Sequence, residues 1–98
     1  MKLRHAAALP LVGWYLMTPP MDAQHNVRSD LPLGQWAITL SFDSAKECEA
    51  ERSREFDHSL KDLTDPANMS TDQLIRDGWK VELQRKCVAT DDPRLKGN

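Results

Sequence analysis

Two cysteines, Cys48 and Cys87, constrain the fold of this chain more than any other feature. The chain has 98 residues, which is enough for one domain, and a domain of this size buries too little apolar surface to be secure on its core alone. A disulfide between cysteines far apart in the sequence restricts the unfolded chain and so stabilises the folded one. We therefore expect a Cys48–Cys87 disulfide in a chain that reaches an oxidising compartment.

The N-terminal residues predict export. Lys2 and Arg4 precede an uncharged and mostly apolar run from Ala6 to Met17. A basic n-region followed by a short apolar h-region is typical of a signal peptide, whereas a membrane-spanning helix needs roughly 20 apolar residues. We expect a signal peptide over residues 1–23, no transmembrane helix, and a periplasmic or secreted protein. The alternative is a buried N-terminal segment of a cytosolic protein.

The region after this run predicts a linker before the folded part. The segment between Thr18 and Gly34 is rich in proline and poor in apolar residues, as extended linkers are. Ala23 suits the last position before a cleavage site, although Met21 is bulkier than the small residue usual two positions earlier. We expect residues 24–34 to be a linker and residues 35–98 to form a small disulfide-stapled domain.

The first elements of that domain have clear local signals. From Trp36 to Phe42 apolar and smaller residues alternate, which predicts a half-buried strand with its larger side chains on one face. Ser44 and Glu47 then have the spacing of a capping box, so a helix should begin there and continue to about Leu63.

The second half of the domain is less clearly marked. Ser70 and Gln73 form another capping-box pattern. The following residues fit both a helix and a strand between positions 79 and 86, and we expect a helix to about Arg85 because its polar residues are good helix formers. A short strand over 87–89 would follow and pair with the first. The predicted fold is a small α+β domain with one strand, two helices, a short C-terminal strand and one disulfide.

Composition and spacing argue against several function classes. The net charge is −2 and no basic stretch is present, so we expect no nucleic-acid binding. The nearest histidine to Cys48 is His58, and this spacing does not suit a zinc site. No catalytic motif occurs, so we predict no catalytic residue, no metal and no cofactor. The alternative is a small thiol-dependent enzyme or redox factor that uses Cys48, because a cysteine near a helix N-terminus can have a lowered pKa.

Two groups of residues are candidates for partner binding. Trp14 and Tyr15 would lie on a flexible apolar arm if they survive processing. Asp91, Asp92 and Arg94 form a polar cluster near the other end of the chain. This cluster either recognises a partner or forms a terminal turn in which an aspartate caps backbone amides and Arg94 pairs locally.

Three segments together resemble a known group of proteins: Trp14–Met17 with the following prolines (WYLM-PP), residues 41–49 (SFDSA and ECE) and residues 87–96 (CVATDDPRLK). They resemble a group of short bacterial exported proteins that has no assigned activity. The resemblance implies that the chain is exported and that both cysteines belong to the shared pattern. In that group the WYLM-PP segment follows the signal peptide, whereas here it is continuous with the apolar run. We expect a non-catalytic envelope or secreted binding module, whose partner is an envelope protein or the cell surface.

Overall fold

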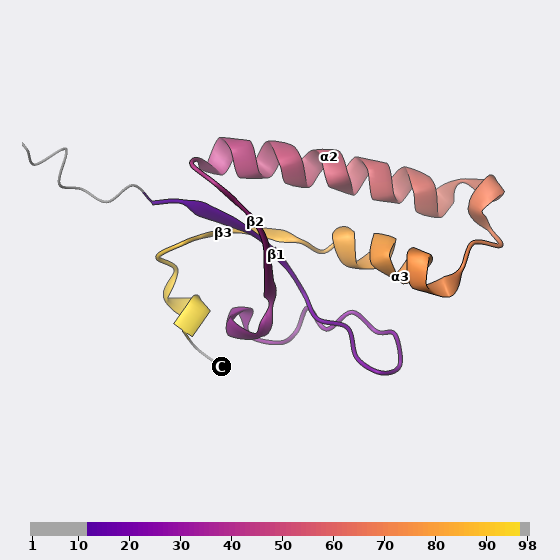
Figure 1. Cartoon of the computed structure of the whole chain (residues 1–98), viewed down its shortest axis with the longest axis horizontal. Coiled ribbons are helices and arrows are strands. Elements are labelled where there is room, and N and C mark those ends of the chain that lie inside the picture. The colour runs from indigo at the N-terminus through magenta and orange to yellow at the C-terminus, as the bar shows by residue number, and fades with distance from the viewer. Residues whose placement is uncertain (1–11, 97–98) are drawn as a thin grey trace, which may run out of the picture.

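A three-stranded antiparallel sheet lies at the centre of the structure, a computed structural model that describes residues 12–96. The described residues also form two α-helices, whose places beside the sheet Figure 1 shows, and three short 3₁₀-helices. Cys48 and Cys87 are joined by a disulfide. The predicted class is therefore confirmed: a small single α+β domain with two helices and one disulfide. The sheet has one strand more than the sequence predicted.

The additional strand comes from the segment that the sequence analysis assigned to the signal peptide. The strands are β1 (Trp14–Thr18), β2 (Ala37–Phe42) and β3 (Lys86–Ala89), in the spatial order β2-β1-β3. β1 pairs with both others, and the backbone carbonyl of Gly13 accepts a hydrogen bond of 2.9 Å from the amide of Thr90. The terminal strand β3 therefore pairs with β1 rather than with the strand over 37–42.

A domain that begins at residue 35 does not match this arrangement. Leu16 and Met17 are 0% and 2% exposed, so they are among the most buried residues of the fold. The predicted linker also takes part, since Leu33 is buried. An h-region and a central strand are both short uncharged apolar runs, and hydropathy does not separate them. Residues 1–11 of the predicted signal peptide lie outside the described residues, and the cleavage site stays a prediction.

The two faces of the sheet bury different residues. Leu16 is paired with Leu40 on one side and with Cys87 on the other, and this face is covered by helix α2 (Ala45–Thr64). Met17 points to the opposite face. The core cluster on that face consists of Met17, Leu33, Trp36 and Val88, with Tyr15 and Leu95 packed against it.

A register shift in the β1–β2 pairing means that the large side chains of β2 do not all lie on one face, as the sequence predicted. Leu16 is opposite Leu40, but the next residue, Met17, is opposite Ile38. Because cross-strand partners share a face and neighbours in β1 alternate, Ile38 and Leu40 lie on opposite faces of the sheet. The expectation that the large side chains of this strand share one face is wrong at this bulge.

Helix α2 begins where its capping signal lies. The Ser44 hydroxyl accepts a hydrogen bond of 3.1 Å from the backbone amide of Glu47. The Glu47 side chain returns to the same hydroxyl, which donates to it at 3.1 Å. The helix extends to Thr64, one residue beyond its expected end, and Asp65 and Pro66 then begin a short 3₁₀-helix.

Helix α3 is shorter than predicted. It spans Gln73–Glu82 and packs antiparallel beside the far half of α2, beyond the edge of the sheet (Figure 1). Asp72 caps it, accepting from the amide of Leu74 at 2.8 Å, so the expected cap at Ser70 is wrong. The helix ends before Arg85 because the chain must return to the sheet for Cys87 to reach α2.

The disulfide joins the start of α2 to the edge strand β3. The Cα atoms of Cys48 and Cys87 are 6.0 Å apart, and Cys48 is fully buried over β1. The two residues are 39 positions apart, and the chain-entropy model gives a loop of that length about 4 kcal/mol of stabilisation.

Opening the disulfide should therefore lower the melting temperature substantially. We expect the reduced protein and the Cys48→Ala/Cys87→Ala variant to melt roughly 15–30 °C below the oxidised protein, since each kcal/mol shifts a small domain by several degrees. Thermal melts followed by circular dichroism measure this shift. An unchanged midpoint in both samples would show that the cross-link contributes little to stability.

Two N-terminal deletions test the place of β1 in the fold. A chain that starts at Val12 keeps every described strand, and we expect it to melt cooperatively. A chain that starts at Gln24 lacks the central strand, so β2 and β3 lose their pairing partner and we expect no cooperative transition. Equal melting curves for the two chains would contradict the sheet order described above.

Candidate functional site

The predicted N-terminal arm forms part of the sheet. Trp14 and Tyr15 are the first residues of β1, and both are half-buried. Tyr15 packs against the core cluster that contains Met17. Neither residue therefore lies on a flexible arm, although each keeps part of its ring exposed.

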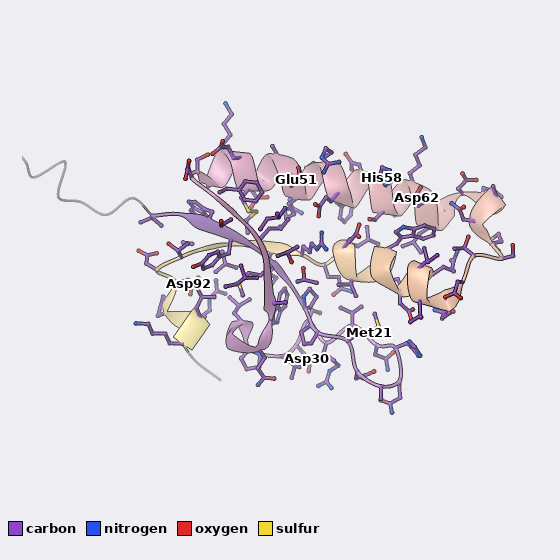
Figure 2. The ribbon with its side chains drawn as sticks, in the orientation of Figure 1. Met21, Asp30, Glu51, His58, Asp62 and Asp92 are labelled. Atoms are coloured by element: carbon purple, nitrogen blue, oxygen red, sulfur yellow. A yellow bond between two sulfur atoms is a disulfide. The ribbon has the colours of Figure 1, made fainter. Side chains whose placement is uncertain are left out.

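The polar cluster near the C-terminal end forms a closed local turn. Asp92 accepts a hydrogen bond of 2.9 Å from the backbone amide of Arg94 and pairs with its guanidinium at 2.7 Å. This contact with Arg94 lowers the pKa of Asp92. Figure 2 labels Asp92 beside the last 3₁₀-helix, Pro93–Lys96. Of the two alternatives that the sequence left open, the geometry matches the terminal turn, and the exposed Asp91 takes no part in these contacts.

The structure brings the two predicted partner-binding groups to the same end of the sheet. Trp14 is opposite Ala89 in the β1–β3 ladder, and Gly13 is bonded to Thr90, the residue before Asp91. The groups are therefore neighbours, which their separation in the sequence does not indicate.

Cys48 does not offer a reactive thiol in this structure. Both cysteines are bonded to each other, so the chain has no free cysteine. The Cys48 side chain is fully buried between α2, to which it belongs, and β1. A nucleophilic role for Cys48 would require an external reductant to open the bond first.

A polar network that sequence reasoning missed connects α2, β1, β2 and Arg85, the residue before β3. Arg85 pairs with Glu55, and both side chains are only 16% exposed. The Nε of Arg85 also donates to the hydroxyl of Thr18 at 2.9 Å, and this hydroxyl is 2.5 Å from that of Thr39. The four residues come from distant parts of the chain, so no local pattern could have revealed the network.

Two neighbouring glutamates on α2 have opposite electrostatic environments. A hydrogen bond from Arg54 lowers the pKa of Glu51, which Figure 2 labels on α2. Desolvation raises the pKa of Glu55, and the hydrogen bond between Glu55 and Glu51 raises this pKa further. The contact of Glu55 with Arg85 acts in the opposite direction and lowers it. The pair is visible in the sequence as two acids four positions apart, which share a helix face.

A hollow of about 220 Å³ lies beside the disulfide, between α2 and β3. Its lining residues are Glu49, Arg52, Arg85, Lys86 and Cys87. Arg52 pairs with Glu49 at 2.6 Å, and the Lys86 ammonium lies 5.4 Å from the centre of the Trp36 ring. The arginines of this hollow are therefore both paired with glutamates, whereas the Lys86 ammonium lies against Trp36, which belongs to the core cluster of the opposite face.

A second polar cluster connects the N-terminal loop to α3. Asp77 is 2% exposed, and one of its oxygens accepts from Gln73 at 2.7 Å. Its other oxygen is 2.7 Å from Nδ1 of His25 but receives no well-aligned hydrogen bond there, so the contact is an attractive charge pair only when the imidazole is protonated. His25 has a φ of 66°, within a turn that is held by the side chain of Asp22. The arrangement anchors the loop to α3.

Exposed large apolar side chains form two groups, and the others are isolated. Ile38 and Leu40 on β2 are 55% and 43% exposed. Met69, Leu74 and Ile75 are exposed around the start of α3, away from the sheet. Exposed apolar groups of this kind are typical of interaction surfaces.

The described part of the chain has neither a cluster of metal-ligating side chains nor a membrane-spanning helix. Within residues 12–96 no group of three potential metal-ligating side chains is close enough to hold an ion. No helix in this part of the chain has the length and apolar character to cross a membrane. The chain matches no family model, no curated protein and no solved structure.

The glutamate pair predicts a specific titration behaviour. We expect Glu51→Gln to lower the pKa of Glu55, because it removes a neighbouring carboxylate that favours the protonated form. Carboxyl NMR titrations measure this shift, and Asp57→Asn on the same helix is the control. An unchanged pKa of Glu55 in Glu51→Gln would contradict the described contact.

The opposite pKa shifts of Glu51 and Glu55 change the stability of the fold in opposite directions as the pH falls. The raised pKa of Glu55 means that the folded state binds its proton more readily, so this residue favours folding more as pH falls from its folded pKa to the ordinary value of 4.5. The lowered pKa of Glu51 stabilises the fold above 4.5, and this contribution is lost as pH falls through its folded pKa.

Proposed function

We propose that this protein is a non-catalytic binding module of the bacterial envelope or the secreted fraction, and that it binds an extended segment of a partner protein along the edge of β2. The observation that supports it is an exposed edge strand without any charged residue. Such an edge offers unpaired backbone donors and acceptors, which a strand from another chain can complete.

The composition and exposure of β2 distinguish it as a docking edge. Its six residues, AITLSF, include neither a charge nor a proline. In the part of the chain that the structure describes, β2 pairs with β1 alone, so its other edge has no partner strand. Ile38 and Leu40 project to opposite faces of the sheet and are both exposed, so a bound strand could contact one on each side.

The opposite edge of the sheet is protected by comparison. β3 has only four residues, begins with Lys86 and is tied to α2 by the disulfide. Short edge strands and lysines are common means of preventing strand addition. The sheet therefore has one protected and one open edge, and the open edge is the better candidate for a functional surface.

The proposed location rests on the cysteines and on the resemblance. Disulfides persist in the periplasm and outside the cell, and they are rare in the bacterial cytosol. Both cysteines of this chain are joined and the chain has no other. An envelope protein is accordingly the proposed partner class, and the buried Cys48 gives no specific support to the alternative of a thiol-dependent factor.

A photo-cross-linking residue at Thr39 tests the proposed surface in the producing bacterium. We expect an adduct with an envelope protein, and we expect its linked peptide to come from an extended segment. A synthetic copy of that peptide should slow amide hydrogen exchange in β2, because its strand would satisfy the open edge. No adduct at Thr39, or an adduct only with a second copy of this chain, would be evidence against the proposal.

Two matched variants distinguish binding at the β2 edge from nonspecific hydrophobic binding. Ile38 and Ile75 are 55% and 52% exposed, on β2 and α3 respectively. We expect Ile38→Lys to weaken binding of the peptide by about tenfold or more, since it replaces an apolar contact with a charge at the interface. Ile75→Lys should leave the affinity unchanged. Equal losses in both variants would contradict docking at β2.

A further inference from the structure

The bulge in β2 is the feature of the open edge that a bound strand has to match. Leu40 and Ile38 are paired with two consecutive residues of β1, so Thr39 between them has no partner of its own in that ladder. We propose that the open edge of β2 selects an extended segment with two consecutive apolar residues, one for each face of the sheet. The inference rests on the proposed function, because it specifies the sequence of the segment that binds at the same edge.

β1 shows which kind of sequence pairs with this bulge. Its residues at the bulge are Leu16 and Met17, which are both apolar and almost fully buried. Neighbouring residues of a regular strand point to opposite faces, so the pair supplies one apolar side chain to each face. The inner edge of β2 is therefore already occupied by the kind of sequence that we propose for its outer edge.

The pairing geometry extends this requirement to the outer edge. Cross-strand partners share a face, and Ile38 and Leu40 lie on opposite faces. The two residues that a bound strand places beside them must therefore be an odd number of positions apart, and the smallest such separation is one. An amphipathic strand has its apolar residues two positions apart, so it can cover one of the two side chains but places a polar residue beside the other.

Side-chain contacts hold the bulge in place. The hydroxyl of Thr39 is 2.5 Å from that of Thr18, which accepts a hydrogen bond of 2.9 Å from Nε of Arg85. Arg85 is in turn paired with Glu55 on α2. A bound strand that straightened β2 would have to break the contact between the two threonines. The edge therefore favours a segment that fits the bulge as it is.

The surroundings of the two positions favour apolar residues in the partner. Ile38 and Leu40 are the large apolar side chains that β2 leaves exposed. β2 itself contains no charged residue, so a charge placed beside either side chain would lose water without gaining a counter-charge from this strand. The segment captured by the cross-linker at Thr39 should accordingly contain two adjacent apolar residues.

Two eight-residue peptides with blocked termini test the inference. Each contains one leucine, one isoleucine, four threonines and a lysine at each end. The leucine and the isoleucine are adjacent in one peptide, and a threonine separates them in the other. NMR titration of the oxidised full-length protein measures both affinities from the amide signals of Thr39 and Ser41. We expect the adjacent pair to bind about fivefold more tightly, since only this peptide covers an apolar side chain on each face.

A variant of β2 shows whether the preference comes from the two faces. We expect Ile38→Ser to bind the two peptides with equal affinity, because one face then offers no large apolar side chain. Ile75→Ser makes the same change at a similarly exposed position on α3 and should keep the preference of about fivefold. Ile38→Thr keeps the β-branched shape and is the second test variant if Ile38→Ser lowers the melting temperature.

The outcomes separate this inference from the proposed function. Equal affinities of the two peptides for the unmodified protein, tighter binding of the separated pair, or an unchanged preference in Ile38→Ser would overturn the inference, while docking at β2 would stand. Absence of shifts in β2 with both peptides would contradict docking at this edge, and the inference with it.

Discussion

The backbone hydrogen bonds of β1 are the interaction on which the rest of the structure depends. β2 and β3 do not touch each other, and each belongs to the sheet only through its pairing with β1. Leu16 and Met17 then supply the buried centre of the two opposite faces. A chain without β1 would lose both cores together, since neither α2 nor the 3₁₀-helices would have a sheet to cover.

The junction of α2 with β3 is held by covalent and polar contacts as well as by packing. The Cys48–Cys87 bond fixes it at one point, and the Arg85–Glu55 pair lies in the same region. A part-buried ion pair adds little net stability because desolvation offsets the attraction, but it strongly disfavours arrangements that leave either charge unpaired. We infer that the disulfide provides stability here, whereas the ion pair determines how α2 sits on the sheet.

The local signal at Ser44 was read correctly from the sequence, whereas the capping box expected at Ser70 was wrong because Asp72 caps α3. The other errors involve tertiary context. Ser44 caps α2 as predicted because a capping box involves only neighbouring residues. β1 was assigned to a signal peptide because an apolar run has the same composition in either role. The bulge opposite Leu16 and Met17, and the contact of Arg85 with Thr18, depend on the pairing of distant segments. The open edge of β2 likewise became apparent only once the strand order was known.

The strand order also explains why the two edges of the sheet differ. With β1 in the centre, β2 and β3 must form opposite edges, and only β3 receives α2 through the disulfide. The edge at β3 has the hollow beside the disulfide, because α2 and residues 85–87 both line it. The uncovered edge keeps its backbone groups available. The disulfide therefore leaves this small sheet with one edge that is tied to a helix and one edge that is open to an extended chain.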